Sequence, residues 1–353
     1  DLFPGNESEK VHMLPIINRT RKDYGFGRII VVADSGLSTS DNICRLNGTN
    51  RQKNNSRDGY VYGQSVRGAD AEFKAWVLDQ KEYKDTRIEA SPENMQADDA
   101  EVKNNDTVIF RHKSRIYPRT ITITREYADG HTGKQKVVVD QKQMVYYSSK
   151  YAKKQKLERD RTVERAKDLI AHPKKYDKIS AKGASGYVMN LSFSKETGEV
   201  VDRNLQLDEA KIKEEEKYDG YYSIVTSELN LTDIELRKIY RGLARIEETF
   251  KITKSEFDTR MIYVRTNDHI DAHFTVCFTA LVIIRLLQMK LDRKYTAAQL
   301  LESLRKYSCA SFEKNTYQFH FRNEIIDACG KAFNMKLSYK YRTQEDIRRL
   351  LKY

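Results

Sequence analysis

The feature that most constrains the fold is an unbroken run of β-branched residues that leads from Ile29 to Ala33. A run without polar alternation is typical of a strand covered on both faces. It ends at Asp34, with Gly36 two residues later. A carboxylate at the carboxyl end of a buried strand stands where α/β sheets place catalytic groups. The alternative is that Asp34 only caps the next helix.

The segment from 38 to 218 has a different pattern. Glu7–Tyr24, before this segment, has the spacing of a helix. The segment itself has short alternating runs, and a turn at Ala128–Gly130 indicates a hairpin. A long basic helix is predicted over Lys150–Ala171. Such a helix is most simply a solvated surface, and the alternative is that it lies along DNA phosphates. We interpret the segment as a mainly β insertion with runs at Tyr60–Tyr62, Thr107–Arg111, Thr120–Thr124, Val137–Val139 and Met144–Tyr147.

A single helix is predicted over Thr232–Ser255. Thr232, with Glu235 three residues later, has the pattern of a capping box, which satisfies free amides at a helix start. Apolar residues recur at helical spacing along one face, which we therefore expect to be buried. These residues are Ile239, Leu243, Ile246 and Phe250.

Beside that face, Tyr240, Glu247 and Lys254 follow one another at intervals of seven residues. Seven residues are close to two helical turns, so the three side chains would form one stripe with about 10 Å between neighbours. A phenol, a carboxylate and an ammonium on one stripe could hold a metal ion and a nucleic-acid phosphate. The alternative is a solvated helix edge. Within the functional interpretation, Glu248 could replace Glu247 if the helix is rotated.

Composition narrows the class of partner. Lys and Arg outnumber Asp and Glu by 63 to 51, a net charge of +12, which favours a polyanion and nucleic acid first. The four cysteines have no metal-binding spacing, and the N-terminus lacks the pattern of a secretory signal. The apolar stretch 272–289 is interrupted by His273 and Arg285, so we expect a buried core helix rather than a membrane span. These features predict a basic cytoplasmic protein.

Asp34 and Glu247, with a β insertion between them, suggest metal-assisted phosphoryl transfer, because Mg²⁺ prefers carboxylate oxygens. In this combination the chain resembles the DDE transposases of bacterial insertion sequences, in the group with a Tyr-Arg-Glu-Lys signature. The resemblance runs from residue 1 to about 305. Its matching segments are the 240/247/254 stripe, Ile29–Leu37 for the strand with the family's second aspartate, Leu2–Glu9 and Asp219–Glu228.

The resemblance implies an α/β fold with a ribonuclease H-like (RNase H-like) core, a large mainly β insertion domain and a helical C-terminal part. The first part of the core would be 1–40 and the insertion 41–218. The remainder of the core, with the glutamate helix, would be 219–292. A C-terminal extension would be 293–353.

The activity implied is Mg²⁺-dependent cleavage and strand transfer at the ends of an insertion sequence, with Mn²⁺ as an alternative ion. Asp34 and Glu247 would be the catalytic acids and metal ligands. Tyr240 and Lys254 would hold phosphates near the cleaved end, and Arg241 and Arg245 are the other candidate DNA contacts. The implied partners are terminal inverted repeats and target DNA, bound by a homodimer in the bacterial cytoplasm, with no membrane.

Two departures from the family pattern leave the activity of this chain open. The position of the signature arginine holds Leu243, and Arg241 and Arg245 are each about 200° round the helix from it. The family's first aspartate has no counterpart, so we expect that residue 1 is not the natural start or that the gene is truncated.

Two other functions stay open, a catalytically inactive DNA-binding or dimerising remnant and another RNase H-like nuclease. Among single residues, Asp219 most simply opens a strand. His269 and His273 lack a third metal ligand. Trp76 is most simply a core residue, with stacking on DNA as the alternative.

Overall fold

The structure is a computed structural model. It describes residues 7, 9–47, 58–89, 101–102, 107–127, 129–195, 197, 199–200, 204–257 and 263–351. It divides into two compact units, Phe3–Leu243 and Ala244–Tyr353. The four-part division predicted from the sequence stays a prediction. Most of the Leu2–Glu9 match lies outside the described residues.

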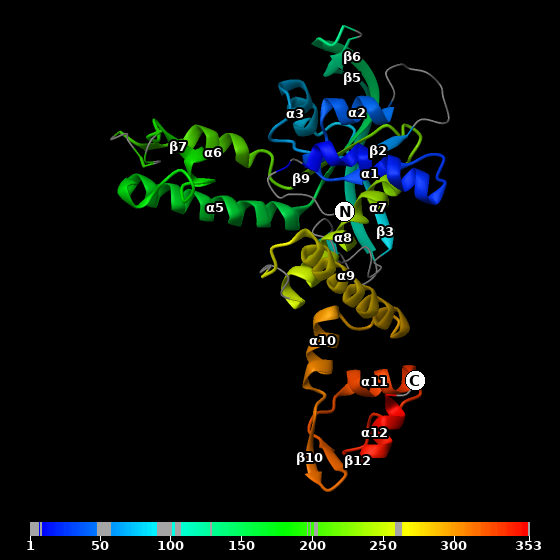
Figure 1. The fold of residues 1–353 in the computed structure, drawn as a ribbon. Helices are drawn as coiled ribbons and strands as arrows, with labels where there is room; N and C mark the ends of the chain where they lie inside the picture. Colours follow the sequence, from blue (N-terminus) through cyan, green and yellow to red (C-terminus); the bar gives the residue numbers. More distant parts are fainter. Residues whose placement is uncertain are drawn as a thin grey trace. The chain divides into compact units, whose positions relative to one another are not determined.

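The first unit is built on one mixed, curled sheet (Figure 1). Its strands follow the order β1 (Ile30–Ala33), β2 (Gly59–Gln64), β9 (Tyr221–Thr226), β6 (Thr132–Tyr147), β5 (Thr107–Glu126) and β3 (Lys84–Glu89), with β4 (Glu101–Val102) beside β5. β1 and β2 are parallel, and the other neighbours are antiparallel. The fold class is therefore mixed α/β, and the strand predicted from the β-branched run is confirmed.

Helices cover both faces of this sheet. On one face α1 (Glu9–Tyr24) and α2 (Ser40–Asn47) pack in a core with Tyr60 and Tyr62. On the other, α7 (Asp233–Arg241) packs in a core with Val61. Neighbouring residues of β2 thus point to opposite faces, as the pleat of a strand requires. The short elements η1 (Ser35–Leu37) and α3 (Ala71–Leu78) follow β1 and β2 in the chain.

The elements between β6 and β9 have a small core of their own. The long helix α5 (Ser149–Ala171) leads away from β6, and its predicted extent is confirmed (Figure 1). Leu169 of α5 is fully buried in this core together with Ala181. The other elements here are η2 (Pro173–Lys175), η3 (Ala184–Tyr187), β7 (Val188–Met189), β8 (Gln206–Leu207) and α6 (Glu209–Glu216).

The second unit is mainly helical. Its core brings together Ile252, Leu281, Leu300 and Ile325 from four different helices. A small antiparallel sheet, in the order β10-β11-β12, completes it. The elements are α8 (Leu243–Lys251), η4 (Ile252–Glu256), α9 (Asn267–Lys290), α10 (Ala297–Lys306), β10 (Cys309–Glu313), β11 (Thr316–Phe319), α11 (Glu324–Ala332), β12 (Tyr341–Thr343) and α12 (Gln344–Leu350).

The prediction of one continuous helix over Thr232–Ser255 is wrong. α7 ends at Arg241, Gly242 forms a turn, α8 begins at Leu243, and the last segment is π-helical. The Gly242 amide donates to the Ile239 carbonyl at 3.0 Å, a bond one residue tighter than that of an α-helix. Glycine is a weak helix former, so it is the natural place for the break.

The expected burial of two apolar faces is confirmed only in part, since Ile239 of α7 and Leu281 of α9 pack in cores but other residues do not. Ile246 and Phe250 of α8 are 50% and 57% exposed. In α9, predicted as a buried core helix, Phe278 is 64% exposed and Ile283 62%. By length and apolar content α9 could cross a membrane, although core helices of soluble proteins pass the same test. The periodicity of these helices predicted which residues share a face but not what covers that face.

Candidate functional site

Asp34 stands at the carboxyl end of β1, as predicted. Its side chain is exposed, and its Oδ1 accepts a hydrogen bond of 2.7 Å from the Gly36 amide. Asp34 is thus the N-cap of η1, which was the alternative interpretation. A Cβ atom on Gly36 would lie 2.9 Å from the same oxygen, which explains the glycine. Capping fixes the direction of the carboxylate and leaves it accessible to a ligand.

Tyr240 comes to this same edge from α7. A Cβ atom on Gly63 would clash with the Tyr240 hydroxyl and would lie 3.4 Å from the Ser35 amide nitrogen. The ring of Tyr240 is partly buried against the core that α7 shares with β2 and β9. The Tyr240 hydroxyl and the turn after Asp34 therefore meet over Gly63.

The register of the strands places this meeting point at the carboxyl edge of the parallel pair. Ala33 pairs with Tyr62, so Asp34 and Gly63 are the next residues of their strands. Ligands of open α/β sheets bind outside the carboxyl ends of strands. An exposed carboxylate and a phenol at this edge can bind a cation and donate a hydrogen bond to an anion.

The other predicted site residues lie in or near the second unit. Glu247 of α8 and Lys254 of η4 are exposed, and the Lys254 ammonium lies 5.6 Å from the centre of the Phe250 ring. Arg241 ends α7 in the first unit, and Arg245 belongs to α8. Tyr240 belongs to α7, whereas Glu247 belongs to α8 and Lys254 to η4, so the three residues do not share one uninterrupted α-helix.

Glu248, the neighbour of Glu247, forms an ion pair within the second unit. Its Oε2 lies 3.3 Å from the Arg285 guanidinium of α9. Glu248 is therefore a structural acid of the second unit. Its side chain serves as a natural comparison for Glu247.

The start of α7 is anchored by a buried ionic network that sequence analysis missed. Asp233 lies 2.7 Å from both the Lys142 ammonium and His112 Nδ1. Burial favours the neutral acid, but hydrogen bonds from His112, Lys142 and Ser114 outweigh it and hold the pKa of Asp233 well below its usual range. In the sequence, Asp233 has only the pattern of a first-turn acid, because its partners come from strands far away in the chain.

The capping box at the same helix start is confirmed. The Thr232 hydroxyl accepts from the Glu235 amide, and the Glu235 carboxylate accepts from the Thr232 amide. The cap and the Asp233 network together fix α7 on the sheet. They thereby fix where Tyr240 lies, two turns further along.

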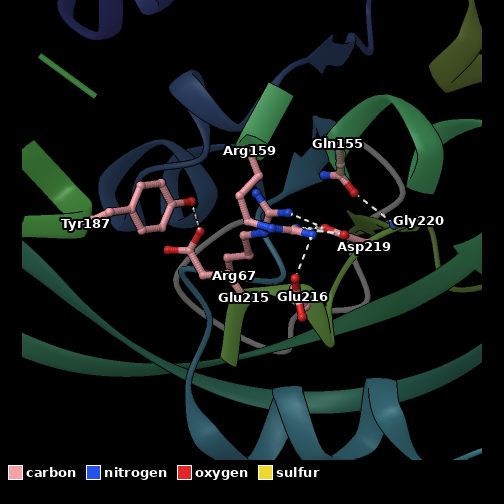
Figure 2. Close-up of polar contacts among 8 residues, drawn as sticks. All are labelled: Arg67, Gln155, Arg159, Tyr187, Glu215, Glu216, Asp219 and Gly220. Carbon is pink, nitrogen blue, oxygen red and sulfur yellow. Dashed lines mark hydrogen bonds and ion pairs between the residues drawn. The ribbon is translucent and has the colours of Figure 1, made fainter. Parts of the chain in front are cut away.

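A second network, which the sequence analysis also missed, joins α5 to the sheet (Figure 2). Asp219 accepts from Arg159 at 2.6 and 2.7 Å and from Arg67 at 2.7 Å, and the Arg159 side chain is only 2% exposed. Gln155 accepts from the Gly220 amide at 2.8 Å. Since two guanidiniums occupy its carboxylate, Asp219 is a structural residue, and we define Asp219, Arg159 and Arg67 as the α5 clamp.

Among the described residues, no three His, Cys, Asp or Glu side chains come together as a metal-binding group. Asp34 belongs to the first unit and Glu247 to the second, and each is a separate candidate ligand.

Trp76 packs beside Phe73 at the edge of a core cluster, with Arg115 and Lys113 over its ring at 4.5 and 5.0 Å. It is a partly buried core residue, as the simpler interpretation predicted. His273 lies 3.8 Å from the Cys277 sulfur on the same helix.

Comparison with known proteins identifies no relative: no family model, no curated protein and no solved structure matches this chain.

Proposed function

We propose that the chain is a DNA phosphoryl-transfer enzyme of the DDE transposase type, with an RNase H-like core. The observation that carries the proposal is that the Tyr240 hydroxyl reaches the turn after Asp34, at the carboxyl edge of β1 and β2. A carboxylate there could hold a catalytic metal ion, and a phenol could donate a hydrogen bond to a phosphate oxygen. The resemblance seen in the sequence supplies the reaction: cleavage and strand transfer at the ends of an insertion sequence.

Each residue has a proposed role in that reaction. Asp34 and Glu247 are the carboxylates for Mg²⁺ or Mn²⁺, which when bound would polarise the scissile phosphate. The Tyr240 hydroxyl donates to a phosphate oxygen beside Asp34, and Lys254 adds positive charge for the same strand. Arg241 and Arg245 are further candidate contacts to the DNA backbone.

The overall charge supports DNA as the substrate. The net charge of +12 favours a polyanionic partner. We propose that the protein acts on terminal inverted repeats and target DNA, as a homodimer in the bacterial cytoplasm. A duplex cut at both ends of an element calls for two copies of the site.

Cleavage by the complete gene product tests the proposal. With Mg²⁺ and a supercoiled plasmid carrying the DNA that flanks the gene, it should nick the plasmid at the element ends. Asp34→Asn and Glu247→Gln should each slow nicking by roughly 100-fold or more. Glu248→Gln, which changes a neighbour bound to Arg285, should cleave as the unchanged protein does. Undiminished cleavage by either Asp34→Asn or Glu247→Gln would overturn the proposal.

A second candidate is a DNA-binding protein without cleavage activity. It is favoured by Leu243 at the signature arginine position and by the lack of a three-acid group among the described residues. It predicts DNA binding that weakens with salt and no Mg²⁺-dependent nicking. The plasmid experiment distinguishes it from the first candidate.

A further inference from the structure

The start of α5 lies at the edge of the sheet that carries Asp34. β2 and β6 both run antiparallel to β9, so they point the same way, and β1 is parallel to β2. The carboxyl ends of β1, β2 and β6 therefore share one edge. Asp34 follows the first of these strands, and α5 begins at Ser149, two residues after β6 ends. Three strand spacings, or about 14 Å, separate β1 and β6 across the sheet. The register places Ala33 level with Gln143, so Asp34 lies one residue beyond that line and Ser149 lies six residues beyond it.

The first turn of α5 is fixed to this edge. The Ser148 amide donates to the Gly220 carbonyl at 2.9 Å, and the Tyr151 ring stacks on Tyr222 of β9 with centroids 3.8 Å apart. Gly220 has a φ of +85°, and a Cβ there would lie 2.9 Å from Ala152 Cβ, so the helix passes close to the backbone before β9. These contacts hold the helix start against β9.

The α5 clamp fixes the direction in which the helix leaves the sheet. Arg159, in the second quarter of α5, reaches Asp219 just before β9, and Asp219 also binds Arg67 just after β2 (Figure 2). A buried ion pair with three charge-assisted bonds has a defined geometry. The helix is therefore a rigid arm whose position is set relative to β2, and so relative to Asp34 and Gly63.

The positive charge of α5 is concentrated at the end nearest the sheet. From Ser149 to Leu157 the helix has four lysines and no acid, and all four lysines are exposed. From Glu158 to Ala171, four basic residues are balanced by four acids. The residues of the basic half are Lys150, Lys153, Lys154 and Lys156. We call this half the basic root of α5.

The amino end of a helix carries partial positive charge, and the first turn of α5 contains no acid, so the start of this helix favours an anion. Lys150, Lys153 and Lys154 follow the i, i+3, i+4 spacing of one helix face.

We infer that the basic root of α5 binds the phosphate backbone of the DNA strand whose reacting phosphate lies at Asp34 and Tyr240. The inference rests on the proposed function and adds to it the surface that holds the flanking DNA. Lys150 to Lys156 covers about 9 Å of helix axis, a length that spans two or three nucleotides at about 3.4 Å each. The clamp sets the distance between the bound backbone and the reacting phosphate.

DNA binding by two matched triple variants tests the inference. One replaces Lys150, Lys153 and Lys154 by Gln, and the other replaces Lys167, Lys174 and Lys175, at the far end of the arm, by Gln. Both remove three exposed positive charges, so they alter the net charge equally. The probe is a mixed-sequence DNA duplex, and the affinity is measured by anisotropy over a series of salt concentrations without Mg²⁺.

The root triple should bind more weakly and lower the slope of log affinity against log salt by about 2 to 3, since each phosphate contact contributes about 0.9. The far-end triple should change the slope by less than about 1. The far-UV circular dichroism and Tm of the root triple should match those of the unchanged protein, because Gln is a good helix former and the lysines are exposed.

Equal weakening in the two triples would overturn the inference and leave the proposed function standing. Absence of binding by the unchanged protein at low salt would remove DNA as the ligand and would overturn both. The assay contains no Mg²⁺ and reports no cleavage, so binding is separated from catalysis.

Discussion

The hydroxyl of Tyr240 occupies the space that a Cβ atom on Gly63 would need. Gly63 is buried in β2 and Tyr240 belongs to α7, so one missing side chain on the sheet lets a helix residue reach the turn after Asp34. A larger residue at position 63 would displace the Tyr240 hydroxyl from the turn after Asp34. The relationship links the packing of α7 directly to the proposed site.

Gly63→Ala should therefore destabilise the first unit by roughly 1–3 kcal/mol, the usual cost of overpacking. Tyr240→Phe removes the clashing oxygen, and the nearest ring atom would then lie 3.3 Å from the new Cβ. The double variant should recover part of the lost free energy of unfolding, as contacting residues couple in a double-mutant cycle. Urea unfolding of the four proteins measures this coupling.

The matched control is Gly68→Ala. A Cβ at Gly68 would meet nothing nearer than the Ser65 hydroxyl oxygen at 3.4 Å, an ordinary contact. Its stability should stay close to that of the unchanged protein. If the effects of Gly63→Ala and Tyr240→Phe are simply additive, the two side chains do not meet as described.

The Asp233 network should make stability depend on pH in the acid range. The pKa of Asp233 is lowered from 3.8 in the folded state. A lowered carboxyl pKa adds stability that is present above about pH 4 and is lost as the pH falls towards the folded-state value. Asp233→Asn should lower the free energy of unfolding by about 3 kcal/mol at neutral pH, because Lys142 stays buried without a counter-charge.

The difference in unfolding free energy between Asp233→Asn and the unchanged protein should shrink between about pH 4 and pH 2. Asp168→Asn is a useful comparison, because Asp168 also has a lowered pKa, caused by hydrogen bonds from Tyr176 and His172, but lies on the surface. It should have little effect on stability. A constant difference for Asp233→Asn at every pH would contradict the role given to its charge.

The α5 clamp should be needed to keep helix α5 in contact with β9. Asp219→Asn leaves the buried Arg159 guanidinium with only the Glu216 carboxylate, 3.5 Å away, and should cost about 3 kcal/mol. Trypsin should then cut the basic root of α5 faster than it does in the unchanged protein, because the helix separates from β9. Glu216→Gln removes only an exposed partner 3.5 Å from Arg159 and should cost about 1 kcal/mol or less. Equal trypsin rates for the two variants would contradict the clamp.

Local patterns in the sequence predicted local features well. The β-branched run became β1, Asp34 took its place at the strand end, Thr232 and Glu235 formed their capping box, and the basic helix began within one residue of its predicted start. Each of these depends on residues a few positions apart. The hairpin was predicted as separate runs, because Pro118 and the polar residues around it interrupt the alternation within β5.

Features that depend on distant residues could not be predicted in the same way. Asp219 and Asp233 were not recognised as parts of buried networks, since Arg159 and Lys142 come from other elements. The break at Gly242 was hidden by apolar spacing that continues through it. The exposure of α9 was missed because hydropathy indicates which side chains avoid water but not whether the fold provides a cover.

The central claim is that DNA binds at the edge of the sheet where Asp34 and Tyr240 meet. A photo-crosslinking amino acid placed at exposed Ser35, next to Asp34, tests it directly. The comparison is the same amino acid at exposed Asn230, which follows β9 at the opposite edge. With bound duplex DNA, position 35 should crosslink efficiently and position 230 should not. Crosslinking from position 230 but not from position 35, in protein that binds the duplex, would contradict the account.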